Sequence, residues 1–141
     1  MKRTRPLERG RHPNARGASR TSASRDGALT VRLRKPLERS LRAGHPWIFR
    51  EAVEAFEAAP GAAVRVVDRS GRFIASGLSE AGPIAVRVFA LDERPVDEAL
   101  FAERVDAAFG LRAQLAPPDT NAYRLLHGEG DRLPGVVCDR Y

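Results

Sequence analysis

The sequence has little of what several classes of protein require. Its 141 residues include one cysteine, Cys138, which excludes an intramolecular disulfide framework. No apolar run approaches the roughly 20 residues of a membrane-spanning helix, and the N-terminus lacks the apolar segment of a secretory signal. The three histidines and Cys138 are too far apart in sequence to form a pair of zinc ligands. These absences predict a cytoplasmic protein with no membrane contact and no metal.

Positive charge is abundant and unevenly distributed. The formal net charge is +6, and residues 1–27 alone carry eight bases against two acids. Residues 28–141 carry equal numbers of bases and acids, so the net charge belongs to the N-terminal segment. Because this segment has almost no large apolar side chains, we predict that residues 1–28 form a disordered basic tail. The tail is interpreted either as an arm that contacts nucleic acid or as a solvated extension.

The pattern after the tail predicts a small, mostly β module over residues 29–94. Residues 29–33 alternate apolar and polar side chains, which is typical of a strand with one buried face. Pro36 and Gly44 are placed to begin and end a short helix whose buried stripe is Leu37 and Leu41. Three further strands are expected, the first two flanking a turn at residues 68–71: Ala63–Val67, Phe73–Ser76 and Ile84–Phe89.

Residues 95–141 predict one long helix followed by a hairpin. Pro95 is placed to open the helix, and apolar residues recur at helical spacing along one face: Phe101, Val105, Ala108, Leu111 and Leu115. Two short strands, Tyr123–Leu126 and Gly135–Asp139, then flank a glycine-rich turn. Since the sequence stops directly after a strand whose edge nothing covers, we expect the chain to be part of a longer protein.

The segment between residues 32 and 50 holds the candidate binding residues. It contains only one acid, Glu38, and six bases: Arg32, Arg34, Lys35, Arg39, Arg42 and Arg50. Cations on neighbouring elements can follow a phosphate backbone, where arginine makes bidentate contacts. The alternative is a solvated helix face. Trp47 and Phe49 lie among these bases, and we interpret Trp47 as a core residue rather than a platform for stacked bases.

Candidate catalytic residues are few. Cys138 lies in an apolar run and is interpreted as a small buried strand residue rather than a nucleophile. His127 lies near Glu129 and Asp131, and we favour local backbone hydrogen bonds over an acid–base cluster. The sequence has neither G-x-S-x-G nor G-x-G-x-x-G. We therefore assign no catalytic, cofactor-binding or metal-binding residue to this chain.

Two sets of segments resemble one known family. Three segments resemble the N-terminal PUA domain of the large-subunit ribosomal RNA methyltransferase I family: Val31–Lys35, Arg39–Leu41 and His45–Phe49. Three others resemble the central domain of the same family: Ile84–Val88, Tyr123–Leu126 and, most specifically, Gly128–Tyr141. The two sets occur in the order of the family's domains and extend over residues 29–141.

This resemblance implies an α+β fold. A small PUA-type β pseudo-barrel (residues 29–94) would precede the long helix and β-hairpin of a truncated central domain (residues 95–141), and the Rossmann-like domain would be absent. Family members are S-adenosylmethionine-dependent RNA cytosine-C5 methyltransferases, in which a cysteine thiolate adds to the base. That cysteine and the cofactor loop lie in the family's third domain. Cys138 matches an ordinary strand position, so no nucleophile is carried over to it.

The resemblance therefore predicts the RNA-binding N-terminal portion of a ribosomal RNA methyltransferase. Ribosomal RNA is the expected partner, and S-adenosylmethionine is expected for the full-length family but not for this chain. A homodimer of the full-length protein stays open. The alternative is a stand-alone PUA-type protein that binds RNA or the ribosome without catalysis, and a third option is a gene remnant. The sequence does not decide whether this chain is itself an enzyme.

Overall fold

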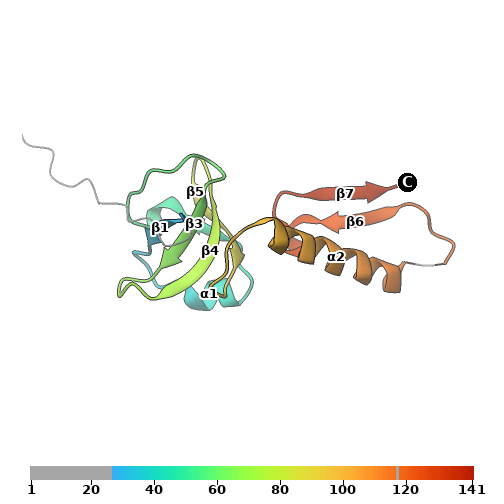
Figure 1. The fold of residues 1–141 in the computed structure, drawn as a ribbon, viewed down its shortest axis with the longest axis horizontal. Coiled ribbons are helices and arrows are strands. Elements are labelled where there is room, and N and C mark those ends of the chain that lie inside the picture. The colour runs from blue at the N-terminus through green and yellow to red at the C-terminus, as the bar shows by residue number, and fades with distance from the viewer. Residues whose placement is uncertain (1–26, 117) are drawn as a thin grey trace, which may run out of the picture.

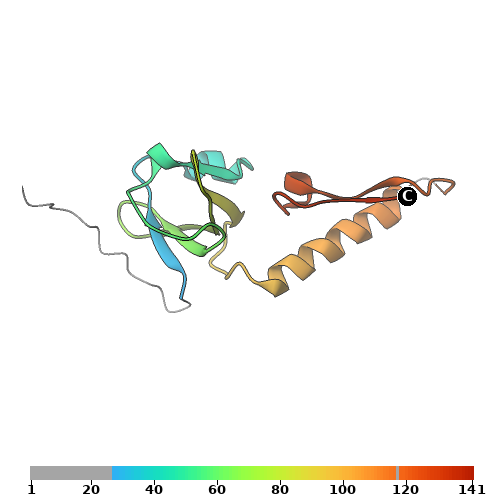
Figure 2. The same ribbon diagram turned by 90° about the horizontal axis from the view of Figure 1, so that it is seen from above.

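The computed structural model describes residues 27–116 and 118–141, which form two units joined by a linker (Figure 1). The first unit (residues 27–90) is a curled sheet, and its strands surround a common interior in the view of Figure 2. The second unit (residues 98–141) is a long helix beside a two-stranded hairpin. The basic tail predicted for residues 1–28 lies outside the described residues except for its last two positions.

The sheet of the first unit has five strands in the order β1-β3-β4-β5-β2. β1 pairs with β3 in parallel, whereas the other neighbouring strands are antiparallel. A short helix follows β1, and a single 3-10 turn follows β2. The elements are β1 (Leu29–Arg32), α1 (Glu38–Arg42), β2 (Trp47–Phe49), η1 (Arg50–Ala52), β3 (Ala63–Val67), β4 (Phe73–Ser79) and β5 (Ile84–Ala90).

The core of this unit follows from alternation along the strands. Val31, Val64 and Val66 are at most 1% exposed and pack in one cluster with the inward side chain of β2, Ile48. Leu41 closes the cluster from α1 and is 3% exposed. Burial of branched apolar side chains on one face of each strand therefore stabilises the curled sheet.

The turn predicted at residues 68–71 is confirmed, and its geometry comes from Asp68. The Asp68 carboxylate accepts hydrogen bonds from the backbone amides of Ser70 at 2.8 Å and Arg72 at 2.9 Å. Gly71 has a φ of 90°, a conformation that glycine adopts without steric cost. This turn joins β3 to β4 and carries Arg69 at its tip.

The second unit consists of α2 (Glu98–Leu115), β6 (Tyr123–His127), η2 (Gly128–Asp131) and β7 (Val137–Arg140). The helix begins three residues after Pro95 because Asp97 caps it, accepting a hydrogen bond from the Leu100 amide at 3.0 Å. The buried cluster joins Ala108 of α2 to Leu126 and Leu133, with Phe101 and Val105 packed against it.

In the second unit, the apolar face of α2 is only partly covered, and the expectation for Cys138 was wrong. Leu111 and Leu115, which share the periodicity of the buried face, are 45% and 70% exposed, because the cluster under α2 is confined to its earlier turns. Cys138 is exposed and not buried, as are all four residues of β7. The physical reason is that β7 pairs only with β6, so its faces lack a covering layer among the described residues.

Two residues, Arg104 and Arg87, make the polar contacts that join the two units. Arg104 of α2 donates to the carbonyl of Phe89 at the end of β5 and to the carbonyl of Arg132 after η2. Arg87 of β5 forms an ion pair with Glu129 of η2 at 3.1 Å. In the linker, Glu93 pairs with Arg65 of β3 at 2.6 Å. A mixed α+β fold with one long helix and a hairpin is thereby confirmed, while the boundaries at residues 28 and 94 stay predictions.

Candidate nucleic-acid interface

Four of the six predicted bases lie together around α1 with their side chains exposed. Arg34 and Lys35 precede the helix, while Arg39 and Arg42 are three residues apart on it and share the side away from buried Leu41. Across residues 27–116 and 118–141, the guanidinium groups of Arg34, Arg39 and Arg42 have no hydrogen bond or ion pair. Lys35 has only a long contact, 3.8 Å, with exposed Glu51. We call Arg34, Lys35, Arg39 and Arg42 the basic face.

The other two predicted bases, Arg32 and Arg50, are held by the fold. Arg32 donates to the carbonyls of Asp68 and Arg69 at 3.1 and 2.9 Å, and so ties β1 to the β3–β4 turn. Arg50 donates to the carbonyls of Glu80 and Gly82 at 2.6 and 2.9 Å, and so ties η1 to the β4–β5 turn. Since their donors are used by backbone carbonyls, the structure does not bring these two into the basic face as free groups.

Sequence reasoning missed Arg69, which the β3–β4 turn brings beside the basic face. Its guanidinium donates to the carbonyl of Arg34, and it lines a hollow of about 330 Å³ together with Lys35. Arg69 lies 35 positions after Arg34 in the chain, so only the parallel pairing of β1 and β3 makes them neighbours. The turn sequence Asp68–Gly71 was the available signal, because a turn tip presents its central side chain to solvent.

A row of exposed aromatic rings lies directly after α1. Trp47 and Phe49 are each 37% exposed, so the expectation that Trp47 belongs to the core was wrong. In a strand, neighbouring side chains point to opposite faces. Ile48, which is 0% exposed, takes the inward direction, so both of its neighbours point outward. The ring centroid of exposed His45 lies 5.9 Å from that of Trp47 and 6.2 Å from that of Phe49. We call His45, Trp47 and Phe49 the aromatic row.

A cleft of about 310 Å³ between the two units connects these features. Arg42 of the basic face and His45 of the aromatic row both line it from the first unit. Arg132 lines it from the second unit, and its backbone has a φ of 58°, an uncommon conformation for a residue other than glycine. Asp92 and Glu129 also line the cleft, and Glu129 is paired with Arg87. The cleft is therefore polar, with cations contributed by both units.

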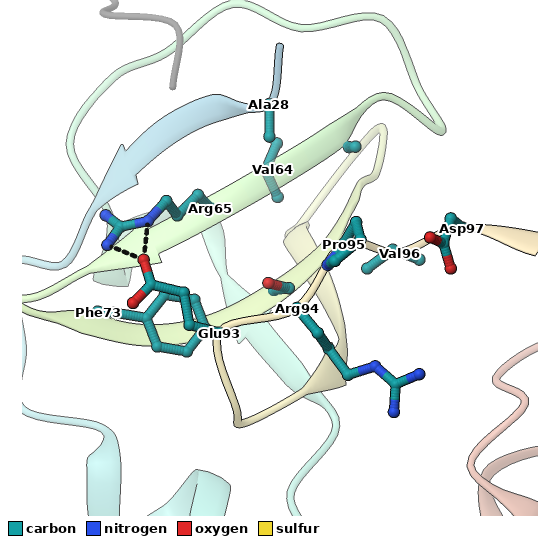
Figure 3. A pocket seen from close by; sticks show the side chains of 11 residues that line it. Ala28, Val64, Arg65, Phe73, Glu93, Arg94, Pro95, Val96 and Asp97 are labelled. Carbon is teal, nitrogen blue, oxygen red and sulfur yellow. Dashed lines mark hydrogen bonds and ion pairs between the residues drawn. The ribbon is translucent and has the colours of Figure 1, made fainter. Parts of the chain in front are cut away.

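A larger cavity, about 560 Å³, lies between β3, β4 and the linker (Figure 3). Its charged groups are engaged with one another: Glu93 accepts two hydrogen bonds from Arg65, and the Arg65 guanidinium lies 5.2 Å from the centre of the Phe73 ring. Arg94 pairs with Glu103 of α2 at 2.9 Å. These contacts attach the linker to the sheet and to the helix, which is a structural role.

The group around His127 is also structural, as predicted. The backbone amide of His127 donates to the Asp131 carboxylate at 2.6 Å, and Arg112 of α2 donates to both carboxylate oxygens at 2.6 and 2.7 Å. Desolvation raises the pKa of Asp131, but the hydrogen bonds from Arg112 and from the His127 amide outweigh it, so the pKa is lowered. Asp131 therefore holds the hairpin on α2 as a carboxylate and is not available as a proton donor.

Residues 27–116 and 118–141 contain no group of three or more histidine, cysteine, aspartate or glutamate side chains that could hold a metal ion. None of the helices in these ranges has the length and apolar character needed to cross a membrane. The exposed bases of the basic face and the exposed rings of the aromatic row make binding the chemistry that the described side chains support best.

Most of the chain is similar in sequence to known proteins. Residues 31–91 match the family of PUA-like domains. The chain is 40% identical over 128 residues to a ribosomal RNA large subunit methyltransferase of Deinococcus radiodurans, covering 84% of this chain and 31% of that protein. It is 43% identical over 114 residues to ribosomal RNA large subunit methyltransferase I of Salmonella arizonae, covering 77% of this chain and 28% of that protein.

A solved structure described as a SAM-dependent methyltransferase from Streptococcus mutans has the same fold over 79% of this chain and 30% of its own, with a TM-score of 0.64 and 18% identity. The chain thus spans about 30% of the length of the curated relatives it matches. The resemblance found in the sequence is confirmed: the chain contains a PUA-like domain and is a relative of ribosomal RNA large subunit methyltransferase I.

Proposed function

We propose that the chain is the RNA-binding portion of a ribosomal RNA methyltransferase and that its basic face holds phosphates of the RNA. The observation that carries the proposal is the set of three exposed guanidinium groups, Arg34, Arg39 and Arg42, that have no hydrogen bond or ion pair in the described part of the chain. Exposed arginines without acidic partners suit bidentate recognition of phosphate. The similarity to ribosomal RNA methyltransferases supports ribosomal RNA as the partner.

The basic face is suited to positioning the RNA and not to recognising its sequence. Phosphate contacts fix the position of a nucleic acid but carry no sequence information. Arg32 and Arg50 contribute indirectly, because their bonds to backbone carbonyls hold β1 and η1 on either side of α1. Arg69 adds a further cation next to Arg34. The target nucleotide is therefore selected by other groups of the full-length protein.

The methyl donor belongs to the same proposal. The family that the chain resembles uses S-adenosylmethionine, and one solved structure of the same fold is a methyltransferase in complex with SAH. The described residues do not fit this cofactor. The cavity of Figure 3 is lined by the mutually paired Arg65 and Glu93, and the first turn of α2 is capped by its own Asp97. We propose that the donor and the reacting cysteine belong to other parts of the full-length protein, and we assign no step of methyl transfer to these residues.

Replacing Arg39 and Arg42 by glutamine tests the RNA-binding face. Glutamine keeps the helix propensity of arginine and removes two charges. We expect affinity for a short fluorescein-labelled single-stranded RNA, measured by anisotropy, to fall about tenfold near physiological salt. The slope of log affinity against log salt should decrease in magnitude by roughly 1.5, because two fewer phosphates are neutralised.

The matched control changes net charge equally at a distant place. Gln114 and Asn121 are exposed in the second unit, and Gln114→Glu with Asn121→Asp also lowers the net charge by two. This control should keep the affinity to within about twofold, since screening weakens charges beyond the Debye length. If both double variants lose affinity alike, binding depends on net charge alone and the basic face is not the site.

A further inference from the structure

The aromatic row is the one feature of this surface that phosphate binding leaves unused. Trp47 and Phe49 are among the larger apolar side chains of the chain, and both are 37% exposed on β2. β2 is the last strand in the order of its sheet, so one edge of it has no neighbouring strand in the described chain. Contiguous exposed apolar side chains are typical of interaction surfaces.

The rings of the row are held in place before any ligand binds. The centroids of Trp47 and Phe49 lie 6.5 Å apart, and all three pairs of rings meet at interplanar angles between 75° and 87°. The backbone amide of Trp47 also donates to Nδ1 of His45 at 3.2 Å, which orients the imidazole. Because the rings restrain one another, a ligand that binds there loses less side-chain entropy than it would with free rings.

The same angles determine which ligand suits the row. No two of its rings lie parallel, so within residues 27–116 and 118–141 none of them supplies a face-to-face stacking partner to another. A planar nucleobase can supply that partner, and stacking of a base on an aromatic side chain does not depend on base identity. Bases paired in a double helix are stacked on one another and cannot reach such a ring.

Charge next to the row favours RNA over an apolar protein surface. Arg42 of the basic face lines the same cleft as His45, so the two surfaces are continuous. Arg87, the register partner of Trp47 on β5, is already paired with Glu80 at 2.6 Å and Glu129 at 3.1 Å, so Arg42 is the available cation. An apolar protein partner would have to desolvate Arg42, whereas an RNA strand contacts it with a phosphate.

From these observations we propose that the aromatic row stacks unpaired bases of the RNA strand whose phosphates lie on the basic face. This inference rests on the proposed function and adds a substrate class to it, namely single-stranded RNA. In this arrangement the strand follows α1 with its backbone and turns one or more bases onto Trp47, Phe49 and His45. The basic face supplies the salt-dependent part of the affinity, and the row supplies a salt-independent part.

The single tryptophan of the chain makes a direct test available. Because Trp47 is the only tryptophan, its fluorescence reports on the row alone. We would titrate the full chain with oligoadenylate, with an abasic oligomer of equal length and charge, and with a blunt RNA duplex. Anisotropy of a label on each ligand reports binding separately from stacking. We expect oligoadenylate to quench Trp47 over the concentration range in which anisotropy rises, and the other two ligands to bind without quenching.

Variants separate stacking from the fold. Trp47→Leu should weaken oligoadenylate binding roughly 5-fold to 100-fold and leave the salt slope unchanged. Trp47→Phe should restore most of the affinity because it keeps an aromatic face. Phe109→Leu is the matched control, since Phe109 is an aromatic residue of α2 that is 44% exposed outside the row, and it should change nothing.

Each remaining outcome decides between the two proposals. Unchanged Trp47 fluorescence in a complex seen by anisotropy overturns base stacking while RNA binding stands. If none of the three ligands binds, both the proposed function and the stacking proposal are overturned. A change of Trp47 fluorescence with protein concentration and no RNA would identify a second copy of the chain as the occupant of the row, which also overturns stacking.

Discussion

At the scale of single residues, two glycines show how environment decides the effect of one methyl group. Gly77 of β4 is the register partner of Val88 on β5, and a Cβ built on it would clash with the carbonyl oxygen of Arg87. Gly110 lies inside α2, and a Cβ there would have no atom within 4 Å outside the helix itself. Gly77 therefore has no room for a larger residue, whereas Gly110 has room for alanine, although both are glycine in the sequence.

We expect Gly77→Ala to lower the free energy of unfolding by about 2–3 kcal/mol, because backbone of β5 has to move to make room. Gly110→Ala should raise it by about 0.5–1 kcal/mol, since alanine restricts the unfolded chain and fits the helix. Urea unfolding followed by circular dichroism measures both. A Gly77→Ala variant as stable as the parent would show that the sheet yields at this crossing more easily than its geometry indicates.

At the scale of elements, local polar contacts shape each turn that carries a binding residue. In the β3–β4 turn, the Ser70 hydroxyl donates to Asp68 at 2.6 Å and Arg72 pairs with the same carboxylate at 3.0 Å. The hydrogen bond from the Ser70 side chain, together with those from Arg72, lowers the pKa of Asp68 from 3.8 to about 2. This turn presents Arg69, so its integrity bears on the basic face.

The Asp68 pKa predicts a pH dependence of stability in acid. A carboxyl whose pKa is lower in the folded state stabilises the fold above its unfolded pKa, 3.8, and loses that contribution as the pH falls toward 2. The unfolding free energy should therefore fall less steeply between pH 4 and pH 2 in Asp68→Asn than in the parent. Urea unfolding at a series of pH values measures this, and Asp119→Asn, at an exposed loop position, is the control. Equal slopes in parent and Asp68→Asn would contradict the assignment.

At the scale of the whole molecule, Arg104 connects the segments of both units that line the cleft. It lies on α2 and donates both to the Phe89 carbonyl of the first unit and to the Arg132 carbonyl of the second. Burial lowers the pKa of its guanidinium, which nonetheless stays charged at neutral pH. Since Arg42 and Arg132 line the cleft from opposite sides, its width depends on this contact.

The chain contains a natural pair of probes for this geometry, because its only tryptophan is in the first unit and its only cysteine, exposed Cys138, is in the second. With an acceptor dye on Cys138, time-resolved transfer from Trp47 measures the distribution of distances between the units. We expect Arg104→Ala to broaden that distribution while the circular dichroism spectrum is retained. An unchanged distribution would mean that the linker and the Arg87–Glu129 pair are sufficient to hold the units.

Much of the architecture could be predicted from local patterns. The strand at residues 63–67, the turn at Asp68 and the burial of Leu41 follow from alternation, turn chemistry and helical spacing, which act between near neighbours. The α+β arrangement of a PUA-type unit followed by a helix and a hairpin was predicted from the family resemblance rather than from periodicity. The errors at Trp47 and Cys138 and the exposure of Leu115 share one cause: a pattern shows which side chains share a face, but not whether another element covers that face.

The sequence by itself determined that the positive charges near α1 are exposed on one side of a short helix, because Leu41 must be buried and the helical repeat then places Arg39 and Arg42 outside. Only the tertiary structure decided which charges are free. Arg32 and Arg50 are satisfied by carbonyls from turns about 30 to 37 residues away, and Arg69 arrives from the same turn that binds Arg32. Hydrogen bonds of that kind depend on which strands pair, and strand pairing is a property of the folded chain as a whole.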